Sequence, residues 1–173
     1  GFVGSRLISE IGENNCKNLD KNQSPFFSEI TTLGDIRNLD EIKINNKTKT
    51  IVLLAAEHKD NVSPTSLYYD VNVDGTKNIL KAMDRAGVKS LIFTSSVAVY
   101  GLENTNISEL SPTKPFNDYG KSKLAAEKIY IDWQNEKPEE RTVVIVRPTV
   151  VFGEGNRGNV YNLFNFIMSG RFM

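Results

Sequence analysis

The feature that most constrains the fold is an uninterrupted apolar run at residues 50–56, which reads Thr-Ile-Val-Leu-Leu-Ala-Ala. A run of this kind, without alternating polar residues, is typical of a strand buried on both faces of a parallel sheet. A second segment, at residues 88–96 with Ile92 and Phe93 at its centre, predicts another buried strand. Residues 67–86 lie between the two runs, have helical periodicity and are followed by Gly87, so they predict a connecting helix.

Strand and helix signals alternate along the whole chain. Further strands are predicted at residues 16–20, 28–33 and 142–146, and further helices at residues 1–11, 38–44, 119–133 and 159–169. This alternation predicts an α/β fold, a doubly wound parallel sheet of the Rossmann-like type. In such sheets ligands bind outside the carboxyl ends of the strands, so residues that follow strands or begin helices form the candidate site.

The composition is that of one ordinary globular domain. The chain has 173 residues, of which 39% are hydrophobic and 24% are charged. Lys+Arg and Asp+Glu number 21 each, so no excess of positive charge predicts binding to nucleic acid. With Cys16 as the only cysteine and His58 as the only histidine, neither a disulfide framework nor a multi-ligand metal site is expected. No run approaches the roughly 18 apolar residues of a membrane span, and a reducing, cytoplasmic location is expected.

The first residues carry a candidate phosphate-binding signal. Gly1 and Gly4 open an amphipathic helix, and glycines at this place let the backbone approach a pyrophosphate at the helix N-terminus. Asp20 ends the next predicted strand, about 20 residues further on, where a carboxylate can accept hydrogen bonds from the adenosine ribose. Its charge would repel a 2′-phosphate and favours NAD over NADP, although Lys17 and Lys21 weaken this preference.

Three further side chains form a candidate catalytic group. Tyr119 and Lys123 are four residues apart at a predicted helix start, so they share one helix face. A lysine beside a tyrosine favours the phenolate, which allows a phenol to act as a base closer to neutral pH. Ser96 places a hydroxyl at the carboxyl end of a predicted strand. Each pattern alone also occurs on ordinary helices and turns, but their coincidence at one sheet edge predicts a catalytic site.

Six segments carry a family resemblance, namely GFVGSRL, LLAA, YDVNVDGTKNIL, FTSSVAVYG, YGKSK and VRPTVVFG. In this order and spacing the chain resembles the extended short-chain dehydrogenase/reductases, the NAD-dependent epimerase/dehydratase family of nucleotide-sugar enzymes. The resemblance implies that Tyr119 is the catalytic base, and that Lys123 lowers its pKa and holds the nicotinamide ribose. It also implies that Ser96 hydrogen-bonds the reacting sugar oxygen and that Asn72 has a structural role.

The same resemblance implies NAD as the cofactor and indicates its contacts. Gly1 and Gly4 resemble the second and third glycines of the family's GxxGxxG motif, and Pro148 begins a segment that lies along the nicotinamide. The complete set of implied cofactor-binding residues is Gly1, Phe2, Val3, Gly4, Asp20, Asp35, Ile36, Ala55, Ala56, Tyr119, Lys123 and Pro148.

Compared with the family, two parts are expected to lie outside these residues. They are the central first strand, with the first glycine of the motif, and most of the C-terminal substrate domain. Residues 1–173 are therefore expected to form an N-terminally truncated NAD-binding domain, with the substrate-binding part starting near residues 153–173. Without the central strand, the predicted strands at 16–20 and 28–33 have no hydrogen-bonded route to the other strands.

The residues after Ser96 distinguish two chemistries. The family's dehydratases carry an Asp-Glu pair there, whereas this chain has Val97 and Ala98, which cannot transfer a proton. Dehydration is therefore disfavoured, and reversible oxidation of one sugar hydroxyl, as in a 4-epimerase, is expected. A reductase or dehydrogenase of the same superfamily, acting on a nucleotide sugar, is the main alternative. A third class, a cofactor-binding scaffold without catalysis, is disfavoured because Ser96, Tyr119 and Lys123 are all present.

Longer segments, such as FGEGNRGNVYNLF, are most similar to bacterial 4-epimerases of O-antigen assembly. Those enzymes interconvert N-acetylglucosamine and N-acetylgalactosamine on undecaprenyl diphosphate or on UDP. The resemblance implies a sugar diphosphate substrate on one of these two carriers. It also implies a homodimer and a cytoplasmic enzyme that can associate with the inner face of the cell membrane.

Overall fold

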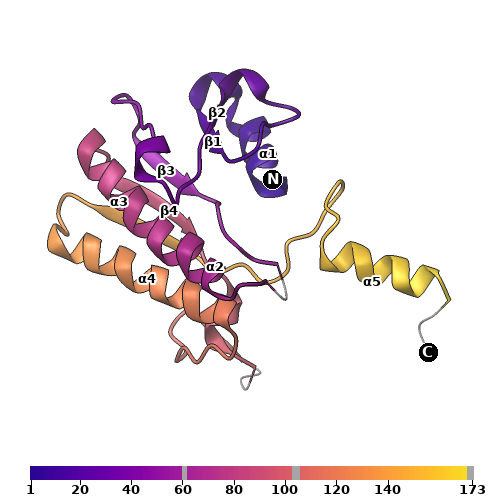
Figure 1. Ribbon diagram of the computed structural model, residues 1–173. Helices are drawn as coiled ribbons and strands as arrows, with labels where there is room; N and C mark the ends of the chain where they lie inside the picture. The colour runs from indigo at the N-terminus through magenta and orange to yellow at the C-terminus, as the bar shows by residue number, and fades with distance from the viewer. Residues whose placement is uncertain (60–61, 103–105, 171–173) are drawn as a thin grey trace.

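The computed structural model describes residues 1–59, 62–102 and 106–170, and in this part of the chain the strands form two parallel sheets (Figure 1). β1 (Asn18–Asp20) pairs with β2 (Thr31–Leu33). In the second sheet, β4 (Ser90–Thr94) lies between β3 (Thr50–Leu53) and β5 (Thr142–Val146). Parallel strands connected by helices confirm the predicted α/β, Rossmann-like fold.

The first helices of the chain follow the predicted order. α1 (Phe2–Ile11) precedes β1, and α2 (Ser66–Tyr69) continues through a π-helical turn, Asp70–Asp74, into α3 (Gly75–Ala86). The residue after α3 is Gly87, whose φ of 71° lies in the left-handed region that glycine adopts without a steric penalty. The glycine predicted to end the long helix therefore does so.

The later helices flank the last strand. α4 (Asp118–Glu136) connects β4 to β5, and α5 (Asn159–Met168) follows β5. In Figure 1, α3 and α4 lie side by side along one face of the three-stranded sheet, while α5 extends away from it. Short 3₁₀ helices occupy Glu13–Asn15, Ser28–Ile30, Leu39–Glu41 and Val97–Tyr100.

The main core lies between the three-stranded sheet and the α3–α4 pair. Phe93 of β4 packs against Tyr130 of α4 with ring centroids 4.8 Å apart, and both side chains are buried. Met83 of α3 and Leu91 of β4 are completely buried in the same cluster. The apolar side chains of the sheet and of the α3–α4 pair thus pack together and hold α4 on the sheet. This packing keeps the first turn of α4 near the carboxyl ends of the strands.

The other face of the same sheet is partly open, which differs from the prediction of burial on both faces. Val52, Ile92 and Val144 form one row across the three strands, and Val52 and Val144 are 37% and 47% exposed. Strand residues therefore alternate between a buried and an exposed face. An apolar run alone does not tell which chain segments cover each face.

Two predicted elements differ in type over part or all of their length. The helix predicted at residues 38–44 is only the 3₁₀ turn Leu39–Glu41, because the Asn38 side chain accepts a hydrogen bond from the Asp40 N–H and donates one to Glu41. Such local side-chain bonds compete with helix continuation. The strand predicted at residues 28–33 begins as a 3₁₀ turn and is extended only from Thr31.

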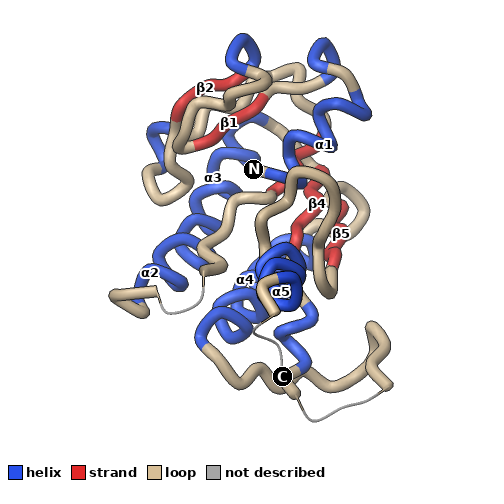
Figure 2. The backbone as a smooth tube through the Cα atoms, turned by 90° about the vertical axis from the view of Figure 1, so that its right-hand side faces the viewer, coloured by secondary structure: helices blue, strands red, loops and turns tan. Residues whose placement is uncertain are grey.

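The two sheets are not joined by strand pairing in the described part of the chain, as the sequence predicts. Figure 2, turned by 90°, shows the β1–β2 pair at the top of the view and β4 and β5 below it, to the right. Of the segment expected to start the substrate-binding part, residues 153–173, the last three lie outside the described residues. None of the described helices has the length and apolar character needed to cross a membrane.

Candidate functional site

The carboxyl end of β4 holds Ser96 in a defined position. The Ser95 N–H donates to Val146 O at 2.7 Å and the Val97 N–H donates to Pro148 O at 3.1 Å, so pairing with the β5 segment continues past the strand. Ser96 is extended and caps the following 3₁₀ helix, because its hydroxyl accepts from the Ala98 N–H at 3.2 Å. The Ser96 hydroxyl is therefore fixed at the sheet edge from both sides.

The first turn of α4 brings Tyr119 to this hydroxyl. Asn117 caps the helix by accepting from the Gly120 N–H at 2.8 Å. A Cβ on Gly120 would lie 2.6 Å from the carbonyl oxygen of Ala98, so only glycine permits this approach of helix to loop. The close contact places the Tyr119 phenol in hydrogen-bond reach of Ser96.

The pKa of Tyr119 does not follow the prediction. Burial raises the pKa of this phenol above its usual value, and the hydrogen bond with Ser96 acts in the opposite direction. Lys123 is not among the causes of this shift, and its ammonium is bonded to another group. Lys123 Nζ donates to Thr94 O at 2.6 Å and lies 4.5 Å from the centroid of the Phe93 ring.

Lys123 itself is a buried cation, with only 2% of its surface exposed. Burial lowers its pKa to about 8, and the nearby carboxylate of Glu127 counteracts this shift. The structure thus brings Ser96, Tyr119 and Lys123 to one edge of the sheet, with Lys123 one helical turn behind the phenol and bonded to the end of β4.

Asn72, in the π-helical turn, connects the segment after β3 to α4. Its amide oxygen accepts from the Glu57 N–H at 2.9 Å, and its amide nitrogen donates to Glu57 O at 3.0 Å and to Ser122 Oγ at 2.9 Å. Ser122 lies between Tyr119 and Lys123 and donates its hydroxyl to Tyr119 O at 2.8 Å. This buried bridge lies in the π-helical turn and supports the structural role implied for Asn72.

The residues expected to bind the pyrophosphate and the adenosine ribose lie at the start of α1 and at the end of β1. Gly1 occupies the N-cap without a side-chain cap, and no acidic residue stands in the first turn. A Cβ at Gly4 would contact Leu54, just beyond β3, at 3.5 Å, so α1 packs beside the end of this strand. Asp20, at the end of β1, is half-buried and accepts from the Asn22 N–H at 2.9 Å. Uncapped helix amides can donate to a pyrophosphate, and a carboxylate at a strand end can accept from ribose hydroxyls, so the chemistry of these residues is compatible with NAD.

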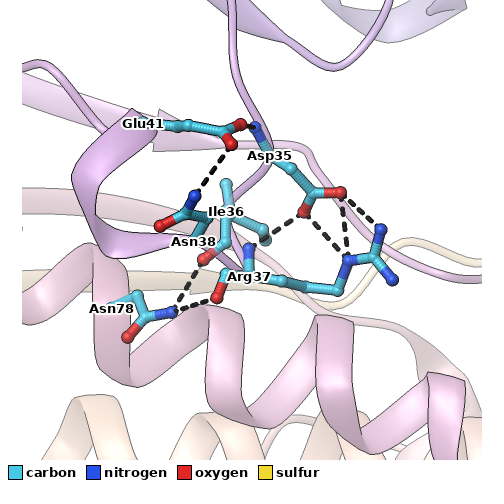
Figure 3. A network of polar contacts seen from close by, with 6 residues as sticks. All are labelled: Asp35, Ile36, Arg37, Asn38, Glu41 and Asn78. Atoms are coloured by element: carbon cyan, nitrogen blue, oxygen red, sulfur yellow. Dashed lines mark hydrogen bonds and ion pairs between the residues drawn. The ribbon is translucent and has the colours of Figure 1, made fainter.

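The loop after β2 contains two more of the predicted cofactor contacts, Asp35 and Ile36, and Figure 3 shows its polar network. The Asp35 carboxylate accepts from Arg37 Nε at 3.0 Å and from Arg37 Nη2 at 2.6 Å, and this pairing lowers the pKa of Asp35. The Asp35 N–H donates to Glu41 at 2.8 Å. The Asn78 amide donates to the carbonyl oxygens of Ile36 at 3.0 Å and Arg37 at 2.9 Å. The loop is therefore held by its own side chains.

The remaining predicted cofactor residues lie on three different segments. Ile36 is buried, and a Cβ on Gly75 would meet its side chain at 2.7 Å, so Ile36 can reach a ligand only through its backbone. Phe2 lies against Gly153, whose Cβ position would be 3.2 Å from the ring. Val3 and Ala55 are exposed, whereas Ala56 and Pro148 are half-buried at the ends of the segments after β3 and β5.

Pattern reasoning missed several residues of this edge. Gly120 is needed for the approach of α4, and Ser95, Glu127 and Arg147 form a buried polar group beneath Lys123. A signal for Glu127 exists in the sequence, because it lies one turn after Lys123 on the helix face that also carries buried Tyr130. A charged residue on a buried face requires a partner.

The sequence profile of the NAD dependent epimerase/dehydratase family matches residues 1–169 of this chain. A relative from Escherichia coli O157:H7, N-acetyl-alpha-D-glucosaminyl-diphospho-ditrans,octacis-undecaprenol 4-epimerase, is 58% identical over 100% of this chain and 53% of its own length. UDP-glucose 4-epimerase of Vibrio cholerae is 31% identical over 98% of this chain and 55% of its own length. The chain thus spans about half the length of these relatives.

Solved structures agree with the sequence comparison. MoeE5 in complex with UDP-glucose and NAD superposes with a TM-score of 0.77 at 30% identity, covering 91% of this chain and 54% of that one. A UDP-galactose 4-epimerase gives a TM-score of 0.79 at 25% identity, covering 99% of this chain and 60% of that one. Family profile, sequence and fold lead to one conclusion: the chain belongs to the NAD dependent epimerase/dehydratase family.

Proposed function

We propose that the full-length protein is an NAD-dependent sugar 4-epimerase, which interconverts N-acetylglucosamine and N-acetylgalactosamine on a diphosphate-linked carrier. The observation that carries the reaction type is the close approach of the first turn of α4 to the Ser96 loop, which brings Tyr119 near Ser96 with Lys123 behind it at the carboxyl edge of the sheet. The identity of 58% to an undecaprenol-linked N-acetylglucosaminyl 4-epimerase supports the sugar and favours the undecaprenyl diphosphate carrier over UDP.

In the proposed reaction, Tyr119 removes the proton from the sugar C4 hydroxyl and Ser96 hydrogen-bonds the same oxygen. NAD, when bound, supplies reversible hydride transfer at C4. Tyr119 returns the proton after the opposite face of the sugar has been presented. Val97 and Ala98, which follow Ser96, offer no group that could remove water, so the steps end with epimerisation.

The proposed cofactor site uses residues from several strand ends. Gly1 and Gly4 would hold the pyrophosphate, Asp20 and the Asp35 loop the adenosine, and Lys123 the nicotinamide ribose. Lys123 would then exchange its bond to Thr94 O, or share it with the ribose hydroxyls. Its position one turn after Tyr119 would also let it favour the phenolate, against the effect of burial.

Cofactor preference tests the role of Asp20. The full-length protein is expected to bind NAD more tightly than NADP, because Asp20 would lie beside the 2′-phosphate of NADP. Asp20→Ser should narrow that preference in calorimetric titrations. Glu140→Ser, which removes an exposed carboxylate just before the amino end of β5, should leave it unchanged. Equal affinities of the unmodified protein for the two cofactors would show that Asp20 is not at the ribose.

The proposed function is tested by incubating the full-length protein with each N-acetylhexosamine donor, on UDP and on undecaprenyl diphosphate, without added NAD. An epimerase turns over with the cofactor it retains. A reductase of the same superfamily stalls after one turnover, and a scaffold produces no conversion. Conversion of only the lipid-linked donor would assign the carrier.

We further propose that the protein works as a homodimer in O-antigen, and hence lipopolysaccharide, biosynthesis, in the cytoplasm at the inner face of the membrane. The identity of 58% to an enzyme whose substrate is linked to undecaprenol supports the pathway and the membrane location, since a lipid-linked sugar reaches the enzyme at a membrane surface. The homodimer rests on the family resemblance alone. Sedimentation with vesicles that contain the lipid substrate, compared with vesicles that lack it, tests the membrane association.

A further inference from the structure

A buried carboxylate lies directly beneath the proposed catalytic residues. Glu127 is 1% exposed and follows Lys123 by one turn of α4. Its Oε1 accepts from the Ser95 hydroxyl and from Arg147 Nε at 3.0 Å, and its Oε2 accepts from Arg147 Nη2 at 2.6 Å. The carboxylate is thus shared between the end of β4 and the end of β5, two segments that pair with each other.

Arg147 extends this group to a fourth segment. Its Nη1 donates to the Tyr100 hydroxyl at 2.6 Å and to Glu109 O at 3.3 Å, and its guanidinium carbon lies 4.9 Å from the centroid of the Tyr100 ring. The hydrogen bond to Glu127 raises the pKa of Arg147. Arg147 therefore connects β5 and α4 to the 3₁₀ helix that Ser96 caps.

The members of this group are sequence neighbours of the proposed site. Ser95 precedes Ser96, and Arg147 precedes Pro148, whose carbonyl oxygen accepts from the residue after Ser96. Glu127 shares its helix with Tyr119 and Lys123. The group is thus a direct polar connection between the strand that carries the hydroxyl and the helix that carries the phenol, on the side away from solvent.

Burial of such a pair is hard to explain by stability alone. Removing two charges from water costs free energy that their attraction offsets only in part, and well-packed apolar residues often do as well. Apolar contacts would, however, let α4 slide relative to the strand ends, whereas bidentate hydrogen bonds fix direction and distance. Proton transfer depends on such fixed distances.

We propose that Ser95, Glu127 and Arg147 form a positioning group that holds α4 against the carboxyl ends of β4 and β5 and so sets the distance between Ser96 and Tyr119. This inference rests on the proposed function. None of the three side chains contacts the substrate in this role. Their removal should impair the chemical step, while cofactor and substrate binding are retained.

Two variants of the full-length, NAD-loaded protein test this role. Ser95→Ala removes only the bond from β4 and leaves the Glu127–Arg147 pair intact, and Glu127→Gln weakens all three contacts. Both are expected to lower kcat by about 10- to 100-fold, since misplacement by about 1 Å has effects of this size. Retained NAD, measured after denaturation, and KM for the sugar donor should stay at wild-type values.

A second readout does not depend on turnover. Hydrogen exchange of the amides at residues 118–123 should become faster in both variants, because the N-terminal part of α4 loses its tie to the strand ends. If Glu127→Gln does not fold, kcat and amide exchange in Ser95→Ala test the proposal. Wild-type kcat together with wild-type exchange in Ser95→Ala would overturn the proposal.

The other end of α4 offers a matched control. Asp84 of α3 accepts from Trp133 Nε1 at 3.0 Å and from the buried Arg141 at 3.2 Å, far along the helix from Tyr119. Asp84→Asn should lower Tm without changing kcat or the exchange of residues 118–123. An equal loss of kcat in Asp84→Asn and Glu127→Gln would assign Glu127 a structural role only.

Absence of epimerase activity in the unmodified protein would instead refute the proposed function. The hydrogen-exchange measurement would still test the positioning group.

Discussion

Replacing Tyr119 by Phe in the full-length protein is expected to lower turnover by about 10²- to 10⁴-fold, the usual contribution of a positioned acid–base group. Only the phenol oxygen is lost, and that oxygen is the group that pairs with Ser96 at the sheet edge. The ring is retained, and so is its packing against Tyr68, whose ring centroid lies 6.3 Å from that of Tyr119. The position of Lys123 is also retained. NAD is therefore expected to remain bound at the wild-type level.

The measurement is kcat for the N-acetylhexosamine donor, with NAD content determined on the same sample. Tyr130→Phe is a matched control, because it makes the same change on the same helix at a residue buried in the core, away from the sheet edge. Turnover should be close to wild type in that variant. Wild-type turnover in Tyr119→Phe would remove this phenol from the mechanism.

The larger elements were predictable because their signals are local. Apolar runs placed β3, β4 and β5, and helical periodicity with Gly87 placed α3. The order of segments then determined the fold class, since parallel strands must be connected by crossovers. The helix predicted at residues 38–44 failed because Asn38 bonds its own neighbours, a competition that periodicity does not register.

The candidate site was predictable only as a set of residues. Spacing along the helix and position after a strand brought Ser96, Tyr119 and Lys123 to one edge, and their chemical roles stay predictions. The bond from Lys123 to Thr94 O and the burial that raises the pKa of Tyr119 both depend on which groups lie nearest in space. No spacing rule contains that information.

Contacts between distant segments were the part that sequence reasoning missed. Glu127 and Arg147 are separated by a helix end, a loop and the whole of β5, yet they form the most buried ion pair described here. Arg37, by contrast, is two residues from Asp35 and pairs with it across an exposed loop. Proximity in sequence would have suggested the Asp35–Arg37 pair. The Glu127–Arg147 pair is more buried, however, and therefore has the larger effect on how the strand ends and α4 are held together.

Residues 1–173, produced by themselves, are expected to aggregate and to lack a cooperative melting transition and micromolar NAD binding. The described part of the chain has two sheets that share no hydrogen bonds, so β1 and β3 each have an edge without a paired strand. Each backbone group buried without a partner costs about 1–3 kcal/mol. β1 is half-buried and β3 is partly exposed, so this cost applies to the edge groups that packing shields from water. Because the total stability of a domain is only about 5–15 kcal/mol, two or three such groups remove a large part of it.

Exposed apolar surface adds to this instability. Val52 and Val144 are exposed on one sheet face, and Leu163, Phe164 and Ile167 of α5 are each about half exposed, at 52%, 60% and 47%. Open strand edges beside apolar surface favour association between chains. The test compares residues 1–173 with the full-length protein in thermal unfolding, light scattering and NAD calorimetry. A soluble 173-residue protein that melts cooperatively and binds NAD at micromolar concentration would mean that its two sheets become joined by a route other than a shared central strand.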